Sequence, residues 1–340
     1  MIATSTDSSI PRDWRRQWRE ALSDPRELLE MLDLGELAGR LSDDAARTFP
    51  LRVPRAFIAR MRRGDRNDPL LRQVLPLDAE DRIVPGFERD AVGDLASRAG
   101  TGILHKYSGR ALLIGTGSCA VHCRYCFRRH FPYAEESAAR EQWRAAIAYL
   151  ESDPSIEELL LSGGDPLSLS TVKLTELTSQ LRDLDQLKRL RIHTRLPIVL
   201  PDRVDQALCD WLADLPWPVA IVVHSNHAQE LDGEVAAACA RLRASGALLL
   251  NQSVLLAGVN DSADALADLS QRLFEIGVLP YYLHLLDRVH GTAHFEVDDA
   301  RVAELERALR CRLPGYLMPR FVREQAGLPY KLPFAGANGG

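Results

Sequence analysis

The sequence lacks a long apolar run and any excess of positive charge. Its first segment, Met1–Pro11, is polar, and no later run approaches the roughly 20 apolar residues that a membrane-spanning helix needs. The 47 acidic residues outnumber the 42 basic ones, and the formal net charge is -5. We therefore expect neither a protein that coats nucleic acid nor one that lies on a membrane surface.

Cysteine is also scarce. Six cysteines occur in 340 residues, too few and too unevenly placed for the disulfide framework of a small secreted domain. Three of them are scattered through segments with a helical pattern: Cys209, Cys239 and Cys311. This usage fits a reducing compartment, and we expect the protein to be cytoplasmic.

The other three cysteines gather in one stretch, Cys119-Ala-Val-His-Cys123-Arg-Tyr-Cys126, with C-x3-C-x2-C spacing. Iron–sulfur clusters are held by thiolates, and three thiolates this close can hold three irons of a four-iron cluster. The fourth iron then keeps an open position for a small molecule, whereas a structural metal site fills all its positions. Two alternatives stay open: a zinc loop completed by His122 or His130, and three unrelated thiols.

Beyond Tyr107, short apolar runs alternate with amphipathic segments, a pattern typical of strand–helix units in a parallel sheet. The predicted strands are 111–115, 158–161, 189–193, 219–223, 248–254 and 278–284. The predicted helices are 137–150, 171–184, 203–212, 233–244, 263–276 and 298–310. Six units are fewer than the eight of a closed barrel, so the sequence predicts an α/β fold with an open, partial (β/α)6 barrel.

The flanking segments have other patterns. Trp14, Trp18 and Leu22 recur every four positions, which indicates a helix with one packed face. The stretch from Asp68 to Asp94 is rich in Pro, Asp and Gly, which indicates an extended connection. The expected division is an N-terminal helical region 1–66, a connection 67–106, the barrel 107–310, a C-terminal segment 311–334 and a disordered tail 335–340.

Polar motifs stand at the carboxyl ends of the predicted strands, where parallel barrels and sheets bind their ligands. The cysteine stretch follows the first strand. The motifs at the later strands are Ser162-Gly163-Gly164-Asp165, Thr194-Arg195, His224-Ser-Asn-His227, Asn251-Gln252-Ser253 and Asp287. One mouth of the barrel should therefore collect cysteines, glycines, a cation, amides and a carboxylate.

These motifs resemble those of the radical S-adenosylmethionine superfamily, in the cysteine stretch and in the later Gly-Gly-Asp. Within it, the chain resembles the lysine 2,3-aminomutases from about residue 85 to Lys331. The motifs that stand in the family's order are Leu160-Leu-Ser-Gly-Gly-Asp-Pro-Leu167, Thr194-Arg-Leu-Pro-Ile-Val-Leu-Pro201, His224-Ser-Asn-His227, Asn251-Gln-Ser-Val-Leu-Leu-Ala-Gly-Val-Asn260 and Pro280-Tyr-Tyr282.

This resemblance implies three cofactors. A 4Fe-4S cluster would be held by Cys119, Cys123 and Cys126, and pyridoxal 5'-phosphate would be a second cofactor. The third is S-adenosyl-L-methionine, for which the implied binding residues are Tyr125, Ser162, Gly163, Gly164 and Asp165.

The resemblance also implies how pyridoxal phosphate and the substrate carboxylate are held. In Gly327-Leu-Pro-Tyr-Lys331-Leu-Pro333, Lys331 matches the lysine that carries pyridoxal phosphate. Taken alone, a lysine near a terminus is a solvated charge. Lys106, Arg110 and Gln252 match contacts to the cofactor phosphate, although Lys106 replaces an arginine and loses its bidentate fork. Arg128 matches the arginine that binds the substrate α-carboxylate.

Two acids bear on substrate choice. Asp287 matches a family aspartate that meets the substrate's terminal ammonium, and Glu324 stands where the family has a second aspartate. Two acids facing one pocket repel each other unless a cation joins them, so they favour a substrate with a cationic side chain. The alternative for Glu324 is a surface acid on the tail.

The implied activity is that of an isomerase, a lysine 2,3-aminomutase that converts L-lysine to β-lysine. The chain stops soon after Lys331 and in this resembles the short family members that make (R)-β-lysine for a ligase to attach to elongation factor P. Expected partners are L-lysine, an electron donor such as flavodoxin or ferredoxin, and elongation factor P with its lysyl ligase; a homo-oligomer stays open. The alternatives are an aminomutase for another amino acid and a non-catalytic metal-binding barrel.

Overall fold

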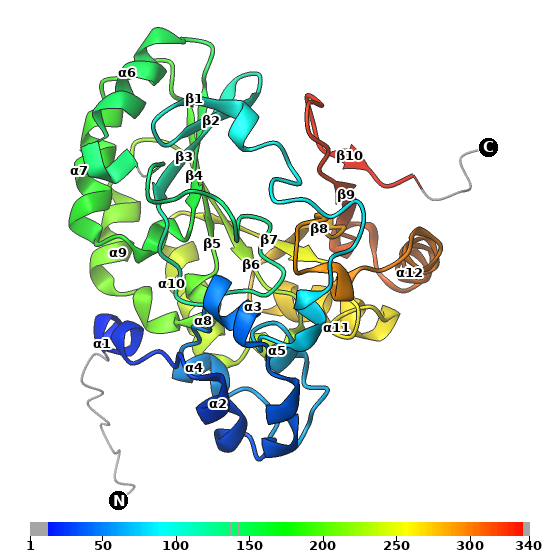
Figure 1. Cartoon of the computed structure of the whole chain (residues 1–340). Helices are drawn as coiled ribbons and strands as arrows, with labels where there is room; N and C mark the ends of the chain where they lie inside the picture. Colours follow the sequence, from blue (N-terminus) through cyan, green and yellow to red (C-terminus); the bar gives the residue numbers. More distant parts are fainter. Residues whose placement is uncertain (1–12, 137, 142, 336–340) are drawn as a thin grey trace, which may run out of the picture.

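The computed structural model describes residues 13–136, 138–141 and 143–335, and its centre is one sheet (Figure 1). Ten strands follow one another in chain order, and β3 to β9 are parallel. The other strands pair antiparallel with their neighbours. Their bounds are β1 (Arg98–Gly100), β2 (Ile103–Tyr107), β3 (Arg110–Thr116), β4 (Glu158–Gly163), β5 (Arg189–Thr194), β6 (Val219–His224), β7 (Leu248–Val254), β8 (Leu279–His284), β9 (Arg320–Arg323) and β10 (Leu332–Pro333).

Six helices each follow one parallel strand and lie around the outside of the sheet (Figure 1). They are α6 (Arg144–Ser152), α7 (Thr171–Leu181), α9 (Gln206–Ala213), α10 (Gly233–Ala244), α11 (Ala263–Glu275) and α12 (Asp299–Arg312). The short helix α8 (Leu196–Val199) follows β5 directly. No helix within the described ranges is both long and apolar enough to cross a membrane.

The predicted partial barrel is confirmed, because all six predicted strands form and a helix follows each. The first helix, predicted over 137–150, is shorter: α6 begins at Arg144, after the 3-10 helix η4 (Ala138–Glu141) and the left-handed Trp143, and residue 137 lies outside the described residues. Apolar residues of the strands are buried between the barrel interior and the helices, among them Leu159, Leu161, Ile192 and Ile221. The order of strands ends at β1 and β10, which are not neighbours among the described strands, so the barrel is open.

The sheet is larger than the sequence predicted. β1 lies within 67–106, the segment expected to be an extended connection, and β2 begins there and ends at Tyr107. β9 adds a seventh parallel strand beside β8, and β10 pairs with it, both within the expected C-terminal segment. These strands are two to five residues long, too short for a clear alternation of apolar and polar residues. The predicted tail lies, from residue 336 on, outside the described residues.

The N-terminal region forms short helices: α1 (Trp14–Arg19), α2 (Pro25–Met31), α3 (Asp43–Thr48), α4 (Arg55–Ile58) and α5 (Pro69–Arg72). Asp24 caps α2 by accepting from the Arg26 backbone N–H at 2.8 Å, and Pro25 occupies the first turn. The expected helix is shorter than its pattern: Trp14 and Trp18 lie in α1 and meet edge to face, but Leu22 lies beyond its end, in an isolated β-bridge with Val53. Trp14 and Leu22 are both buried.

A buried ion-pair cluster fixes the cysteine stretch to this N-terminal region. Glu80, in the 3-10 helix η2 (Asp78–Asp81), accepts from Nε of Arg124 at 2.7 Å and from its Nη2 at 2.6 Å. Nη2 of Arg129 donates to the same carboxylate at 2.7 Å. Because Arg124 lies inside the cysteine stretch, these contacts hold the stretch in one conformation.

We expect Glu80→Ala to lower the free energy of unfolding by about 3 to 5 kcal/mol, because two buried guanidinium groups lose their counter-ion. Denaturant unfolding of the metal-free protein measures this loss. The matched control is Asp44→Ala, whose ion pair with Arg47 is exposed and should change stability by less than about 0.5 kcal/mol. A similarly small change in both variants would contradict the role given to Glu80.

Candidate active site

The cysteine stretch leaves the carboxyl end of β3 and packs on the Gly-Gly turn that ends β4. The Gly164 N–H donates to the Thr116 carbonyl at 2.7 Å. A side chain is excluded at both glycines: a Cβ on Gly164 would lie 2.5 Å from the Ser118 carbonyl oxygen, and one on Gly163 would lie 2.8 Å from that of Thr116. The positive φ of Gly163 also favours glycine there. These glycines therefore let two loops of the mouth touch.

The three thiols share one partly buried location. Burial raises the pKa of Cys119 well above its usual value, and Asp165, Cys126 and Cys123 add to the shift. Burial, with Cys123, raises the pKa of Cys126 to about 11. Iron would remove these protons outright, because a coordinating thiol is deprotonated. The donor set therefore fits a thiolate-held cluster.

The zinc alternative needs a histidine to turn toward the thiols. Nδ1 of His122 instead lies 2.7 Å from the Pro50 carbonyl, and its ring stacks on Phe49. Nε2 of His130 lies 3.4 Å from the His290 carbonyl. Within the described chain, no three His, Cys, Asp or Glu side chains are grouped as ligands of a single ion. Four-iron clusters bind each cysteine at a different iron, so their cysteines do not have to meet at one point.

Asp165 is buried and turned into the protein. Its carboxylate accepts from Thr194 Oγ1 at 2.7 Å and from the backbone N–H groups of Leu167, Arg195 and Leu196 at 3.0, 2.7 and 3.0 Å. The three donors from Thr194, Arg195 and Leu196 tie the end of β4 to the end of β5. The glycine backbone of this motif is also paired: the Gly164 N–H with the Thr116 carbonyl at 2.7 Å, and the Gly163 carbonyl with Tyr133 Oη at 2.8 Å.

A buried group of charges lies beside the cysteine stretch, and it includes an acid that the sequence did not single out. Asp94 accepts from Arg128 Nε at 2.6 Å, and Lys106 Nζ lies 2.6 Å from its other oxygen. Arg128 Nη1 also donates to Ser162 Oγ at 3.2 Å. Burial would raise the pKa of Asp94, but Arg128 and Lys106 outweigh it and hold that pKa below its usual range. Asp94 therefore stays ionised and orients Arg128.

Glu324 follows β9 directly and joins this group to Lys331. Its carboxylate pairs with Lys331 Nζ, accepts from Tyr107 Oη at 2.9 Å and lies 3.5 Å from Lys106 Nζ. These cations outweigh the effect of burial and lower the pKa of Glu324. Glu324 is therefore an interior acid of the barrel mouth, which argues against the alternative of a surface acid.

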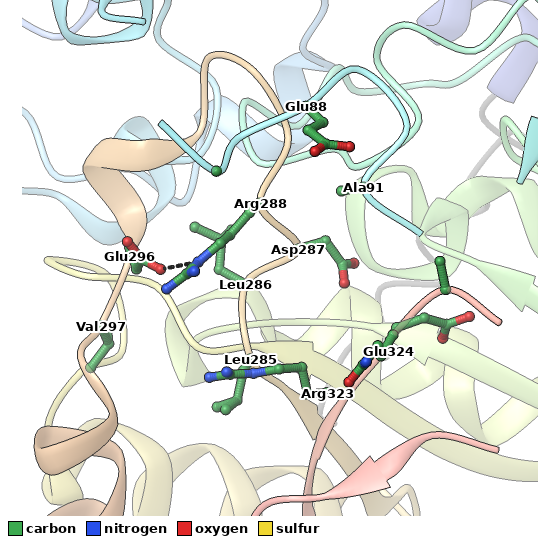
Figure 2. A pocket seen from close by; sticks show the side chains of 13 residues that line it. Glu88, Ala91, Leu285, Leu286, Asp287, Arg288, Glu296, Val297, Arg323 and Glu324 are labelled. Carbon is green, nitrogen blue, oxygen red and sulfur yellow. Dashed lines mark hydrogen bonds and ion pairs between the residues drawn. The ribbon is translucent and has the colours of Figure 1, made fainter. Parts of the chain in front are cut away.

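Asp287, in the loop after β8, is a second acid near Glu324. It lines a pocket of about 370 Å³ together with Glu88, Arg288 and Glu324. Figure 2 shows Asp287 between Glu88 and Glu324, whereas Arg288 turns away to Glu296, with which it forms a 2.6 Å ion pair. Burial raises the pKa of Asp287 to about 7, with Lys331 opposing and Glu324 adding to the shift. A cation bound here would relieve the repulsion between the two acids.

We expect kcat/KM for a cationic substrate to fall about tenfold per pH unit below pH 7, as Asp287 takes up a proton. The pKa is raised, so the Asp287 carboxylate is an anion above pH 7 and loses its charge below it. The substrate ammonium keeps its charge up to about pH 10 and adds no change in this range. In pH profiles of Asp287→Asn this limb should be absent; its persistence would assign the titration to another group.

The expected pyridoxal phosphate residues are only partly assembled. Arg110 lies over the Tyr107 ring at 4.6 Å and so stands one side chain away from Glu324. Gln252 lies in β7, beside His224 of β6 and Tyr282 of β8. No contact in the described ranges joins Gln252 to Lys331.

One buried atom indicates room for a ligand beside Lys331. His193 Nε2 is buried and has no hydrogen-bond partner among the described residues. Burial, then Arg191, Lys331 and Arg128, lower the pKa of His193 well below its usual value, so its ring is neutral. This ring therefore lies within the electrostatic reach of both Lys331 and Arg128. A cofactor held at Lys331 would give this buried nitrogen a partner.

Comparisons with known proteins identify relatives of this chain. A family model described as a 4Fe-4S single cluster domain matches residues 106–194. The L-lysine 2,3-aminomutase of Escherichia coli (strain K12) is 48% identical over 325 residues, which are 94% of each chain. That of Haemophilus influenzae is 43% identical over 95% of this chain and 96% of its own. That of Clostridium subterminale is 31% identical over 94% of this chain and 77% of its own. Since identity of this extent covers nearly the whole of the first two relatives, the protein belongs to the L-lysine 2,3-aminomutase family.

Proposed function

We propose that the protein is an isomerase that converts L-lysine to β-lysine with a 4Fe-4S cluster, S-adenosylmethionine and pyridoxal phosphate. The observation that carries the proposal is the meeting of Arg128, Asp287, Glu324 and Lys331 beside the cysteine stretch. Arg128 can bind a carboxylate, and Asp287 and Glu324 can bind an ammonium. This arrangement suits a substrate that carries these two groups at opposite ends.

The cofactors supply the difficult chemistry. When bound, the reduced cluster with S-adenosylmethionine supplies a carbon radical that removes a hydrogen, and pyridoxal phosphate supplies a conjugated system over which an unpaired electron spreads. We assign the cluster to Cys119, Cys123 and Cys126. Tyr125, Ser162 and the backbone of Gly163, Gly164 and Asp165 are assigned to S-adenosylmethionine, and Lys331, Lys106, Arg110 and Gln252 to pyridoxal phosphate.

The side chains of the site position the substrate. Asp94 and Ser162 hold Arg128 through Nε and Nη1, which leaves the Nη2 edge for the α-carboxylate. Asp287 accepts the side-chain ammonium. Fixing both ends of lysine places its middle carbons in one position, which is the main contribution that a protein makes to a radical reaction.

Lys331 needs to lose a proton before its nitrogen can react. Its Nζ is paired with Glu324, whose lowered pKa keeps that carboxylate ionised, so the proton of Lys331 leaves to water. Glu324 then carries one ammonium at a time, first that of Lys331 and then that of the substrate. This exchange accounts for an acid that contacts Lys331 and also belongs to the proposed substrate site.

The test is an anaerobic assay of the reduced holoenzyme with lysine, glutamate and arginine in parallel. β-Lysine should form from lysine alone. A different product would support the aminomutase for another amino acid. Zinc in the purified protein, with no cleavage of S-adenosylmethionine, would support the non-catalytic metal-binding barrel.

We further propose that the product serves elongation factor P in the cytoplasm, with flavodoxin or ferredoxin as electron donor. Greater identity to the Escherichia coli and Haemophilus influenzae relatives (48% and 43%) than to that of Clostridium subterminale (31%) supports grouping the chain with the former. Mass spectrometry of elongation factor P from a strain lacking this gene is decisive. The β-lysine adduct should be absent, and its persistence would separate the enzyme from that modification.

A further inference from the structure

Arg195, the first residue after β5, contacts two residues of the cysteine stretch. Its side chain is 7% exposed, and its Nη1 lies 2.8 Å from Cys123 Sγ and 2.8 Å from Tyr125 Oη. The expected cofactor residues do not include it. A buried guanidinium aimed at a thiol has to be explained, because taking this charge out of water is costly.

The opposite edge of Arg195 is fixed by two partners. Nη2 donates to Gln73 Oε1 at 2.7 Å and to Glu230 Oε2 at 3.0 Å. Glu230 Oε1 accepts from the backbone N–H groups of Asn226 and His227 at 2.9 and 3.1 Å. These donors keep Glu230 in place, and Glu230 keeps Arg195 pointing at the sulfur.

We infer that Arg195 is a positioning residue that raises the reduction potential of the cluster by donating to the Cys123 thiolate. The inference rests on the proposed cluster site. Reduction moves one electron from the flavodoxin or ferredoxin to the cluster, with no bond made or broken. Hydrogen bonds to the sulfurs and nearby positive charge stabilise the added electron, which makes the cluster easier to reduce.

Glu230 gives the inference its sharpest test, because its charge has the opposite sign. Removing Arg195 takes away the hydrogen-bond donor to Cys123 and leaves the Glu230 carboxylate buried beside the cluster without its partner. Both changes make the cluster harder to reduce. Removing the carboxylate charge while keeping Arg195 makes reduction easier. A purely structural role for the pair would not produce shifts of opposite direction.

The experiment is a redox titration of the anaerobically reconstituted enzyme, followed by electron paramagnetic resonance, without lysine or pyridoxal phosphate. Arg195→Gln should lower the equilibrium constant for reduction of the cluster about tenfold. For one electron this is a shift of the reduction potential by about 59 mV to a more negative value. Arg195→Lys keeps the charge and should shift less in the same direction. Glu230→Gln should shift to more positive potential.

The matched control is Arg203→Gln, which removes another buried arginine that donates to the carbonyls of Leu167 and Leu169. It should leave the potential unchanged. An unchanged potential in Arg195→Gln, or shifts in the same direction for Arg195 and Glu230 variants, would overturn the inference. If Arg195→Gln assembles no cluster, the reduction potential of Arg195→Lys tests the inference in its place. Loss of the cluster in both variants would mean that Arg195 serves cluster assembly instead. A wild-type protein without a cluster would refute the proposed function itself.

Discussion

Replacing any one of Cys119, Cys123 and Cys126 with alanine is expected to abolish the four-iron cluster and all turnover. Each thiolate holds a different iron, so two remaining thiolates cannot keep a cluster that has one iron open for S-adenosylmethionine. The effect should be complete. Iron and sulfide analysis, the visible absorbance of the cluster, and cleavage of S-adenosylmethionine measure it in each variant.

The chain offers a matched control in Cys239, which is buried in α10 away from the cysteine stretch. Cys239→Ala removes a buried thiol and should keep full iron content and activity. The exposed Cys311 should be equally replaceable. Full iron content and turnover in any single variant of the three clustered cysteines would refute the assignment of this stretch.

Lys331→Ala is expected to remove the attached pyridoxal phosphate and all turnover while the cluster survives. The visible absorbance of the bound cofactor should disappear, and borohydride should no longer fix the cofactor to the protein. Since the alanine also leaves Glu324 with Lys106 and Tyr107 as partners, the fold should be retained. Absorbance spectra and peptide mapping after borohydride treatment measure the outcome.

The control for Lys331 is Lys173→Ala, because Lys173 is exposed on α7 and paired with Glu176. It should retain cofactor and activity. Cofactor trapped at Lys173 or at Lys106 of the wild-type protein would overturn the assignment of Lys331. Loss of the cluster in Lys331→Ala would instead indicate that the substitution disturbs the whole barrel.

The fold followed from the sequence wherever strands and helices were long. The strands β3, β4, β6 and β7 each contain a run of three to five apolar residues, and β5 alternates apolar with polar residues. Several helices that follow them have a side-chain cap, such as Asp232 before α10. The strands β1, β2, β9 and β10 were missed because their pairing with neighbours, not their composition, makes them strands.

Only the site residues that lie in recognisable motifs could be predicted from the sequence. The structure brings Arg128, Lys106, Glu324 and Lys331, each singled out by the resemblance to the aminomutases, into one charged group. Asp94 was missed because an acid in a stretch rich in Pro, Asp and Gly gives no sequence signal of its own.

The network below the cysteines was missed for a related reason. Gln73, Tyr125, Arg195 and Glu230 come from four separate segments and meet only in three dimensions. Patterns within a segment cannot show such a meeting.

The contacts of Glu324 have a mechanical consequence. β2 and β9 share no backbone hydrogen bonds, yet Lys106 and Tyr107 at the end of β2 both reach Glu324 just after β9. The Glu324 carboxylate thus links β2 to β9 across the open side of the barrel. In the proposed function the same carboxylate selects the substrate, so a variant that changes Glu324 to accept another amino acid should also loosen this side. A compensating link between β2 and β9 would have to come with it.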